Sequence, residues 1–166
     1  ATGGVIVDAA NQLHIRNGTL TTGTAADTAG TLYFQQSAGT QFTQGSGSTS
    51  LVIANNGTGV VNVVYAGEGN LGQGQGLSGS NTYTGFTGIY DSSVGLPVNE
   101  NALSPGAPPR LGTIPATLVA DSLRISGGNL DVGGSDTNSM HANRGISLAG
   151  AGVTFNSGNN RYTVNS

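Results

Sequence analysis

The ionisable residues that could do acid–base chemistry are few. Asp121, Asp131 and Asp136 lie within 16 residues, and Arg124 and Arg144 occur in related segments. β-Helical polysaccharide lyases and hydrolases use clustered carboxylates, or carboxylates beside arginine or lysine, so these residues could line a shallow cleft. However, the chain has no lysine, only eight acidic residues and no two adjacent carboxylates. We therefore expect no catalytic residues, with a β-helical polysaccharide-active enzyme as an alternative.

Three aromatic residues that are close in sequence could contact a ligand. Tyr83, Phe86 and Tyr90 carry rings that could stack on sugars, although such rings commonly pack in protein cores. We name these three residues as candidate surface-contact residues, with a glycan as the candidate ligand.

Metal and cofactor signals are weak. The chain has no cysteine, and neither His14 nor His141 has a carboxylate beside it at ligand spacing. Residues 67–72 match G-x-G-x-x-G after an apolar segment, but Gln73-Gly74 follows, where a dinucleotide site needs the start of a helix. We expect no metal and no cofactor.

The composition excludes several classes of protein. Of the 166 residues, 29 are glycine and only 8% are charged, with a formal net charge of −3. So much glycine, together with many serine, threonine and asparagine residues, argues against an all-helical fold. The absence of a basic stripe argues against nucleic acid as a partner. No apolar run is long enough to suggest membrane insertion, and the N-terminal residues suggest a piece cut from a longer exported chain.

Apolar residues alternate with polar ones in short segments, which is typical of β-strands. Leu13, Leu32 and Leu51 follow one another at intervals of 19 residues. Farther along, Leu123/Ile125 corresponds to Ile146/Leu148 and Leu130/Val132 to Val153/Phe155, both after 23 residues. Such repeats predict a right-handed parallel β-helix, in which equivalent residues stack at the spacing of hydrogen-bonded strands.

The chain is expected to form one β-solenoid segment over residues 1–166. All five prolines fall within residues 97–115, and proline cannot donate to a central ladder. We therefore predict a proline-rich loop excursion there. The alternative all-β fold is an antiparallel β-sandwich or jelly roll, which also has short strands separated by turns.

The segment Leu77–Gly85 reads LSGSNTYTG. It resembles the signature of the autotransporter-associated β-strand repeats, which occur in the passenger regions of large bacterial surface proteins. Residues 52–57, 122–130 and 143–148 are similar to further blocks of the long form of this repeat, whereas residues 86–93 depart from it. The resemblance implies a parallel β-helical stalk at the bacterial cell surface, without a shared chemistry.

These observations predict a non-catalytic extracellular scaffold, a segment of a stalk, fibre or filament. An open solenoid end exposes unpaired backbone groups, so we expect head-to-tail self-association or adjoining repeats of the same chain. A second hypothesis is an adhesin that binds a glycan or a host surface through residues 83–115.

Overall fold

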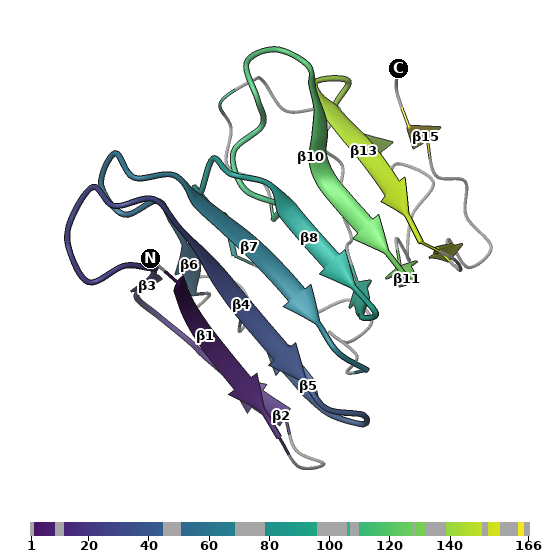
Figure 1. Ribbon diagram of the computed structural model, residues 1–166, viewed down its shortest axis with the longest axis horizontal. Helices are drawn as coiled ribbons and strands as arrows, with labels where there is room; N and C mark the ends of the chain where they lie inside the picture. Colours follow the sequence, from purple (N-terminus) through teal and green to yellow (C-terminus); the bar gives the residue numbers. More distant parts are fainter. Residues whose placement is uncertain are drawn as a thin grey trace.

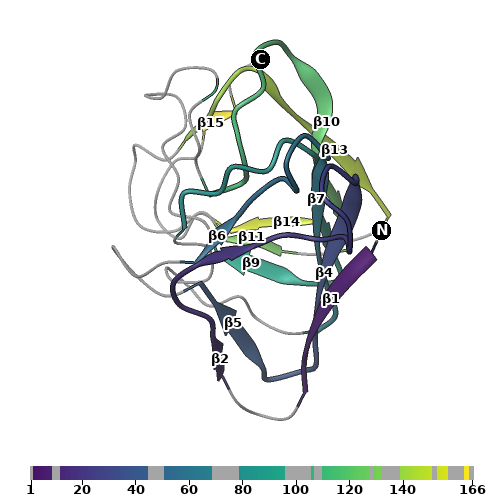
Figure 2. The same cartoon turned by 90° about the vertical axis from the view of Figure 1, so that its left-hand side faces the viewer.

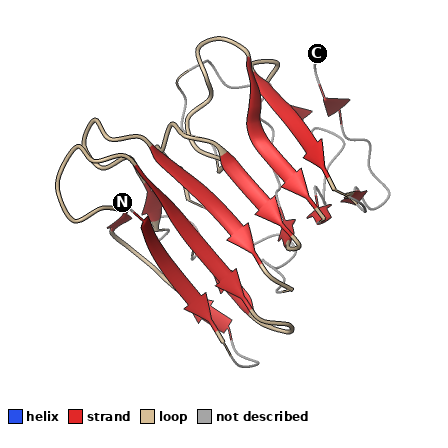
Figure 3. Cartoon of the chain, in the orientation of Figure 1, coloured by secondary structure: helices blue, strands red, loops and turns tan. Residues whose placement is uncertain are grey.

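The computed structural model describes ten segments of the chain, and every element within them is a strand (Figure 3). No helix occurs in these segments, and therefore none that could cross a membrane. The described segments are residues 2–8, 12–44, 51–68, 79–95, 106, 110–127, 129–131, 139–150, 153–156 and 163–164.

The largest element is a six-stranded sheet (Figure 1). Its strands follow the order of the sequence: β1 (Thr2–Val7), β4 (Gly30–Gln36), β7 (Val61–Ala66), β8 (Thr87–Tyr90), β10 (Val119–Ser126) and β13 (Arg144–Ala149).

The remaining strands form short sheets, several of which lie on one side of the large sheet (Figure 2). One short sheet has the order β14 (Thr154–Asn156), β11 (Asn129–Asp131), β9 (Ser93–Gly95). The others are two-stranded and pair β2 (Gln12–His14) with β5 (Gln41–Thr43), β3 (Thr19–Leu20) with β6 (Val52–Ile53), and β12 (Ser139–Met140) with β15 (Thr163–Val164).

Every ladder between these strands is parallel. The prediction of an all-β fold is therefore confirmed, and the antiparallel sandwich or jelly roll is wrong. A large parallel sheet is compatible with a β-helix.

Alternation along each strand determines which side chains enter the core. In β4, Leu32, Phe34 and Gln36 are buried, while Tyr33 and Gln35 between them are exposed. The register places Leu32 beside Val63, so buried residues of neighbouring strands are in contact. One continuous core results, which includes residues from the large sheet and from the short ones.

The stacking predicted from the 19-residue interval is wrong. Leu13 is opposite Phe42, 29 residues farther on, whereas Leu32 is opposite Val63, 31 residues farther on. Leu51 immediately precedes β6, which belongs to a third sheet. The interval arose because successive strands in different sheets share the same alternation of apolar and polar residues.

The 23-residue interval is confirmed for one pair of strands and wrong for the other. Leu123 and Ile125 of β10 are opposite Ile146 and Leu148 of β13. Leu130, however, is opposite Phe155 rather than Val153. The connection from β13 to β14 is two residues longer than that from β10 to β11, which shifts the register.

The predicted loop excursion over residues 97–115 is described at residue 106 and residues 110–115. These residues form no strand, and Leu111 and Ile114 are buried. The rest of the excursion, with four of its five prolines, lies outside the described residues.

One loop contact depends on a carboxylate. Asp27 accepts hydrogen bonds from the backbone N–H of Thr58 at 2.7 Å and from its hydroxyl at 3.1 Å. The backbone hydrogen bond, followed by the hydroxyl, lowers the pKa of Asp27 from its usual 3.8.

Because the pKa of Asp27 is lower in the folded state than in the unfolded chain, its contribution to stability is present above the unfolded pKa and is lost as the pH falls through the folded pKa. We expect Asp27→Asn to be less sensitive to acid than the wild type. Thermal unfolding midpoints measured from about pH 6 to about pH 2 test this. Parallel midpoint curves for the two proteins would contradict it.

Candidate functional site

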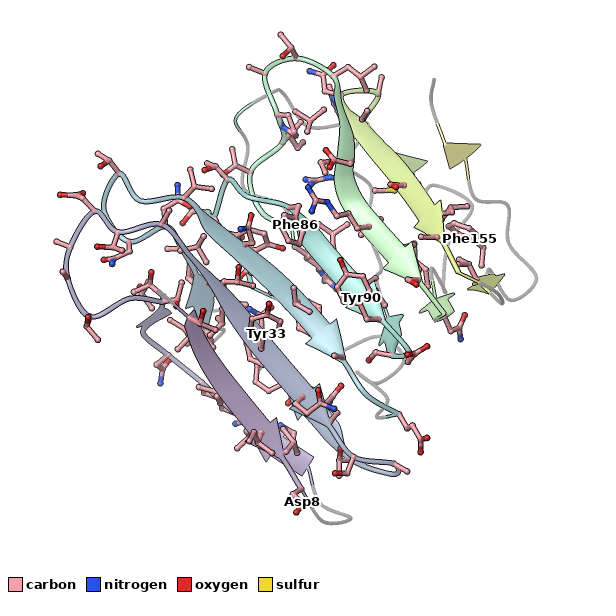
Figure 4. The ribbon with its side chains drawn as sticks, in the orientation of Figure 1. Asp8, Tyr33, Phe86, Tyr90 and Phe155 are labelled. Carbon is pink, nitrogen blue, oxygen red and sulfur yellow. The ribbon has the colours of Figure 1, made fainter. Side chains whose placement is uncertain are left out.

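The three predicted surface-contact residues do not lie together. Tyr83 is fully buried, and its hydroxyl is 2.6 Å from that of Thr87, so Tyr83 has no exposed surface for a ligand. Phe86 and Tyr90 are half-buried and lie on the outer face of the large sheet, together with Tyr33 (Figure 4). The prediction had not included Tyr33, although its position between buried Leu32 and Phe34 indicates an outward side chain.

A cleft of about 530 Å³ lies where β8, β10 and β13 begin. It is bounded on one side by the segment that precedes β10. Its described lining residues are Asn62, Thr84, Gly85, Phe86, Gly106, Thr113, Ile114, Pro115, Ala116, Val119, Asp121, Ser122, Arg124 and Arg144.

Arg124 is held in place within this cleft. Its Nη2 donates to the carboxylate of Asp121 at 2.6 Å, and its Nε donates to the Asp121 carbonyl at 3.3 Å. The guanidinium carbon also lies 3.8 Å from the centroid of the Phe86 ring, a cation–π contact. These contacts fix the plane of the guanidinium while the side chain remains partly exposed.

Arg144 lines the same cleft but has a structural role. It is buried, and its Nη1 and Nη2 donate to the carbonyls of Leu111 and Gly112, each at 3.0 Å. Gly112 has a φ of 80°, and a side chain there would collide with Tyr83. Arg144 therefore anchors the segment that forms one wall of the cleft.

The structure brings together only part of the predicted carboxylate group. Asp121, Arg124 and Arg144 line the cleft, and Asp121 is the only carboxylate among its described lining residues. Asp131 belongs to β11 in another sheet, and Asp136 lies outside the described residues. The two facing carboxylates that glycoside hydrolases use are not found among these residues.

The histidines are involved in local contacts. Nδ1 of His14 lies 2.5 Å from the hydroxyl of Thr43, and Nδ1 of His141 accepts from the N–H of Asn143 at 3.1 Å. Within the described segments, no three histidine, aspartate or glutamate side chains are grouped as metal ligands would be. Of the predicted G-x-G-x-x-G segment, only Gly67 and Glu68 are described.

Comparisons with protein-family models, with curated proteins and with solved structures find no match to this chain. The resemblance to autotransporter-associated repeats therefore stays a prediction based on sequence motifs.

Proposed function

We propose that the chain is a segment of right-handed parallel β-helix and serves as a non-catalytic extracellular scaffold. In this proposal it stacks end to end, with identical copies or with adjoining repeats, to build a bacterial surface stalk, fibre or filament.

The connectivity supports the β-helix. Neighbours in the large sheet follow the order of the sequence, and, except between β7 and β8, short strands of other sheets lie between them along the described chain. Parallel neighbours joined in this way need a connection that leaves the sheet and returns to it. Such crossovers are right-handed in nearly all proteins. A chain that repeats this path forms coils around a shared core.

The observation that carries the proposed stacking is the exposure of core-facing residues at the last strands. Leu148 is 54% exposed, although Ile125, its partner on β10, is only 1% exposed. Phe155 is 40% exposed, although Leu130, its partner on β11, is fully buried. Both side chains belong to core positions that have no following strand to cover them among the described residues.

The opposite edge supports the same proposal. Val5 and Leu13 are only partly buried, whereas Phe34 and Phe42, their partners on the next strands, are fully buried. β1 and β13 are the two edges of the large sheet. Each of these edge strands pairs with one described strand, and the outer side of an edge strand can pair with a further strand. A contact between opposite ends propagates into a filament.

Leu148→Lys is expected to impair end-to-end stacking, because it places a charge where the next strand would cover a leucine. Burying a leucine side chain contributes about 1.5–3 kcal/mol, so the concentration needed for assembly should rise by at least about tenfold. Sedimentation velocity over a range of protein concentrations measures this change.

The matched control is Ser147→Lys, which adds the same charge at the neighbouring exposed position on the other face of β13. It should assemble as the wild type does. Equal assembly of Leu148→Lys and the wild type, with normal unfolding, would contradict the proposed contact.

A further inference from the structure

The cleft beside β10 has the size and chemistry of a small ligand site. Pockets of roughly 300–1,000 Å³, mostly apolar with a few well-placed polar groups, are typical of such sites. The volume here is about 530 Å³, and the apolar part of the lining comes from Phe86, Ile114, Pro115, Ala116 and Val119. A ligand that fits this cleft needs an apolar face as well as polar groups.

The polar part of the cleft is a charge-balanced pair. Arg124 presents N–H donors directly beside the acceptor oxygens of Asp121. Two vicinal hydroxyl groups can accept from the guanidinium and donate to the carboxylate at the same time. Arg144 already donates to two backbone carbonyls. This arrangement favours a neutral polyhydroxylated ligand over a phosphate or a nucleic acid.

The cleft continues along the sheet as an aromatic strip. Arg124 is opposite Gly88, which lies between Phe86 and Tyr90 in the sequence. The Cβ atom of a side chain at Gly88 would lie 2.9 Å from a ring carbon of Tyr90. Because glycine has no Cβ atom, the Tyr90 ring lies close against the sheet at this position (Figure 4). The Tyr90 ring reaches back over Gly88, so it lies on the order of 7 Å from Phe86 along the extended strand. This spacing leaves room for adjacent sugar rings.

We infer that the cleft and this strip bind a neutral oligosaccharide. One pyranose occupies the cleft, where two adjacent hydroxyls contact Asp121 and Arg124 and its apolar face contacts Phe86, Pro115 and Val119. The following sugars run along β8 and stack on Tyr90. This binding site does not depend on end-to-end stacking.

Isothermal titration of the chain with hexasaccharides tests the inference. The probes are neutral hexamers of glucose, mannose, galactose and xylose, together with an acidic hexamer of galacturonic acid. We expect at least one neutral hexamer to bind, with no preference for the acidic one. Arg124→Gln should weaken that binding by about tenfold or more, because it removes charge-assisted hydrogen bonds. Tyr90→Ala should weaken it by a similar factor through loss of the stacked ring.

Tyr33→Ala is the matched control. It removes an exposed ring from the same face of the sheet, on β4, outside the cleft lining. This variant should bind as the wild type does, and unchanged unfolding midpoints would show that all three variants are folded. The inference is overturned if no neutral hexamer binds the wild type at millimolar concentration, if only the galacturonic acid hexamer binds, or if folded Arg124→Gln binds with unchanged affinity.

Discussion

Phe34→Ala is expected to lower the free energy of unfolding by about 4 kcal/mol, near the upper end for core truncations. Phe34 is fully buried, and its ring stacks on Phe42, with centroids 4.5 Å apart, and on Tyr65, with centroids 5.1 Å apart. The substitution therefore removes a ring from between two others and leaves a cavity. Burial, followed by the nearby Tyr83, also raises the pKa of Tyr65, as expected for a phenol in an apolar core.

Urea unfolding of wild type and variant measures this loss. The control is Tyr33→Ala, which removes an aromatic ring one residue away on the exposed face of the same strand. A surface substitution of this kind should change the unfolding free energy by about 0.5 kcal/mol or less. Similar losses for the two variants would show that the assigned inward and outward faces of β4 are wrong.

Asn81→Ala is expected to cost about 3 kcal/mol, because it leaves several buried polar groups unpaired at once. The Asn81 side-chain oxygen accepts from the backbone N–H of Ile53 at 2.8 Å and from Nε2 of Gln44 at 2.9 Å. Its amide nitrogen donates to the Arg110 carbonyl at 2.5 Å and to Oε1 of Gln44 at 3.4 Å. A single fully buried side chain thus joins three segments of the chain.

The unfolding free energies of Asn81→Ala, Gln44→Ala and the double variant form a cycle that isolates their interaction. Because the two side chains share hydrogen bonds, their effects should be non-additive by more than about 0.5 kcal/mol. Thr82→Ala is the matched control, since the Thr82 side chain is exposed. The contacts of Thr82 with Ile53 and Thr113 are made by its backbone N–H and carbonyl, which alanine keeps. Additive losses, or a loss at position 82 equal to that at position 81, would contradict this role of Asn81.

Local alternation was sufficient to predict several of the strands and their buried faces, but not β1, β8 or β9. Leu32/Phe34 and Leu123/Ile125 are buried as expected. The 23-residue interval also predicted the pairing of β10 with β13 correctly, because Leu123 and Ile125 lie opposite Ile146 and Leu148. The pairing of the N-terminal strands could not be predicted in the same way. Their partners are 29 and 31 residues away, and strands in between carry the same alternation in other sheets.

The cleft was predictable only in part. Asp121 and Arg124 are three residues apart, so their ion pair is a local feature of the sequence. The contact of Arg124 with Phe86 instead depends on the register between β8 and β10, which are separated along the chain by the proline-rich segment. The sequence names Tyr83 as a candidate surface-contact residue while leaving core packing open, and its spacing from Phe86 and Tyr90 does not reveal that its ring lies in the core.

Cryo-electron microscopy of the 166-residue chain at high concentration tests the scaffold proposal most directly. We expect unbranched filaments whose strands lie across the long axis at a spacing of about 4.8 Å, with β13 of one copy beside β1 of the next. Discrete particles of a single chain at every concentration would contradict the stacking of identical copies, and filaments whose strands run along the axis would contradict the parallel β-helix.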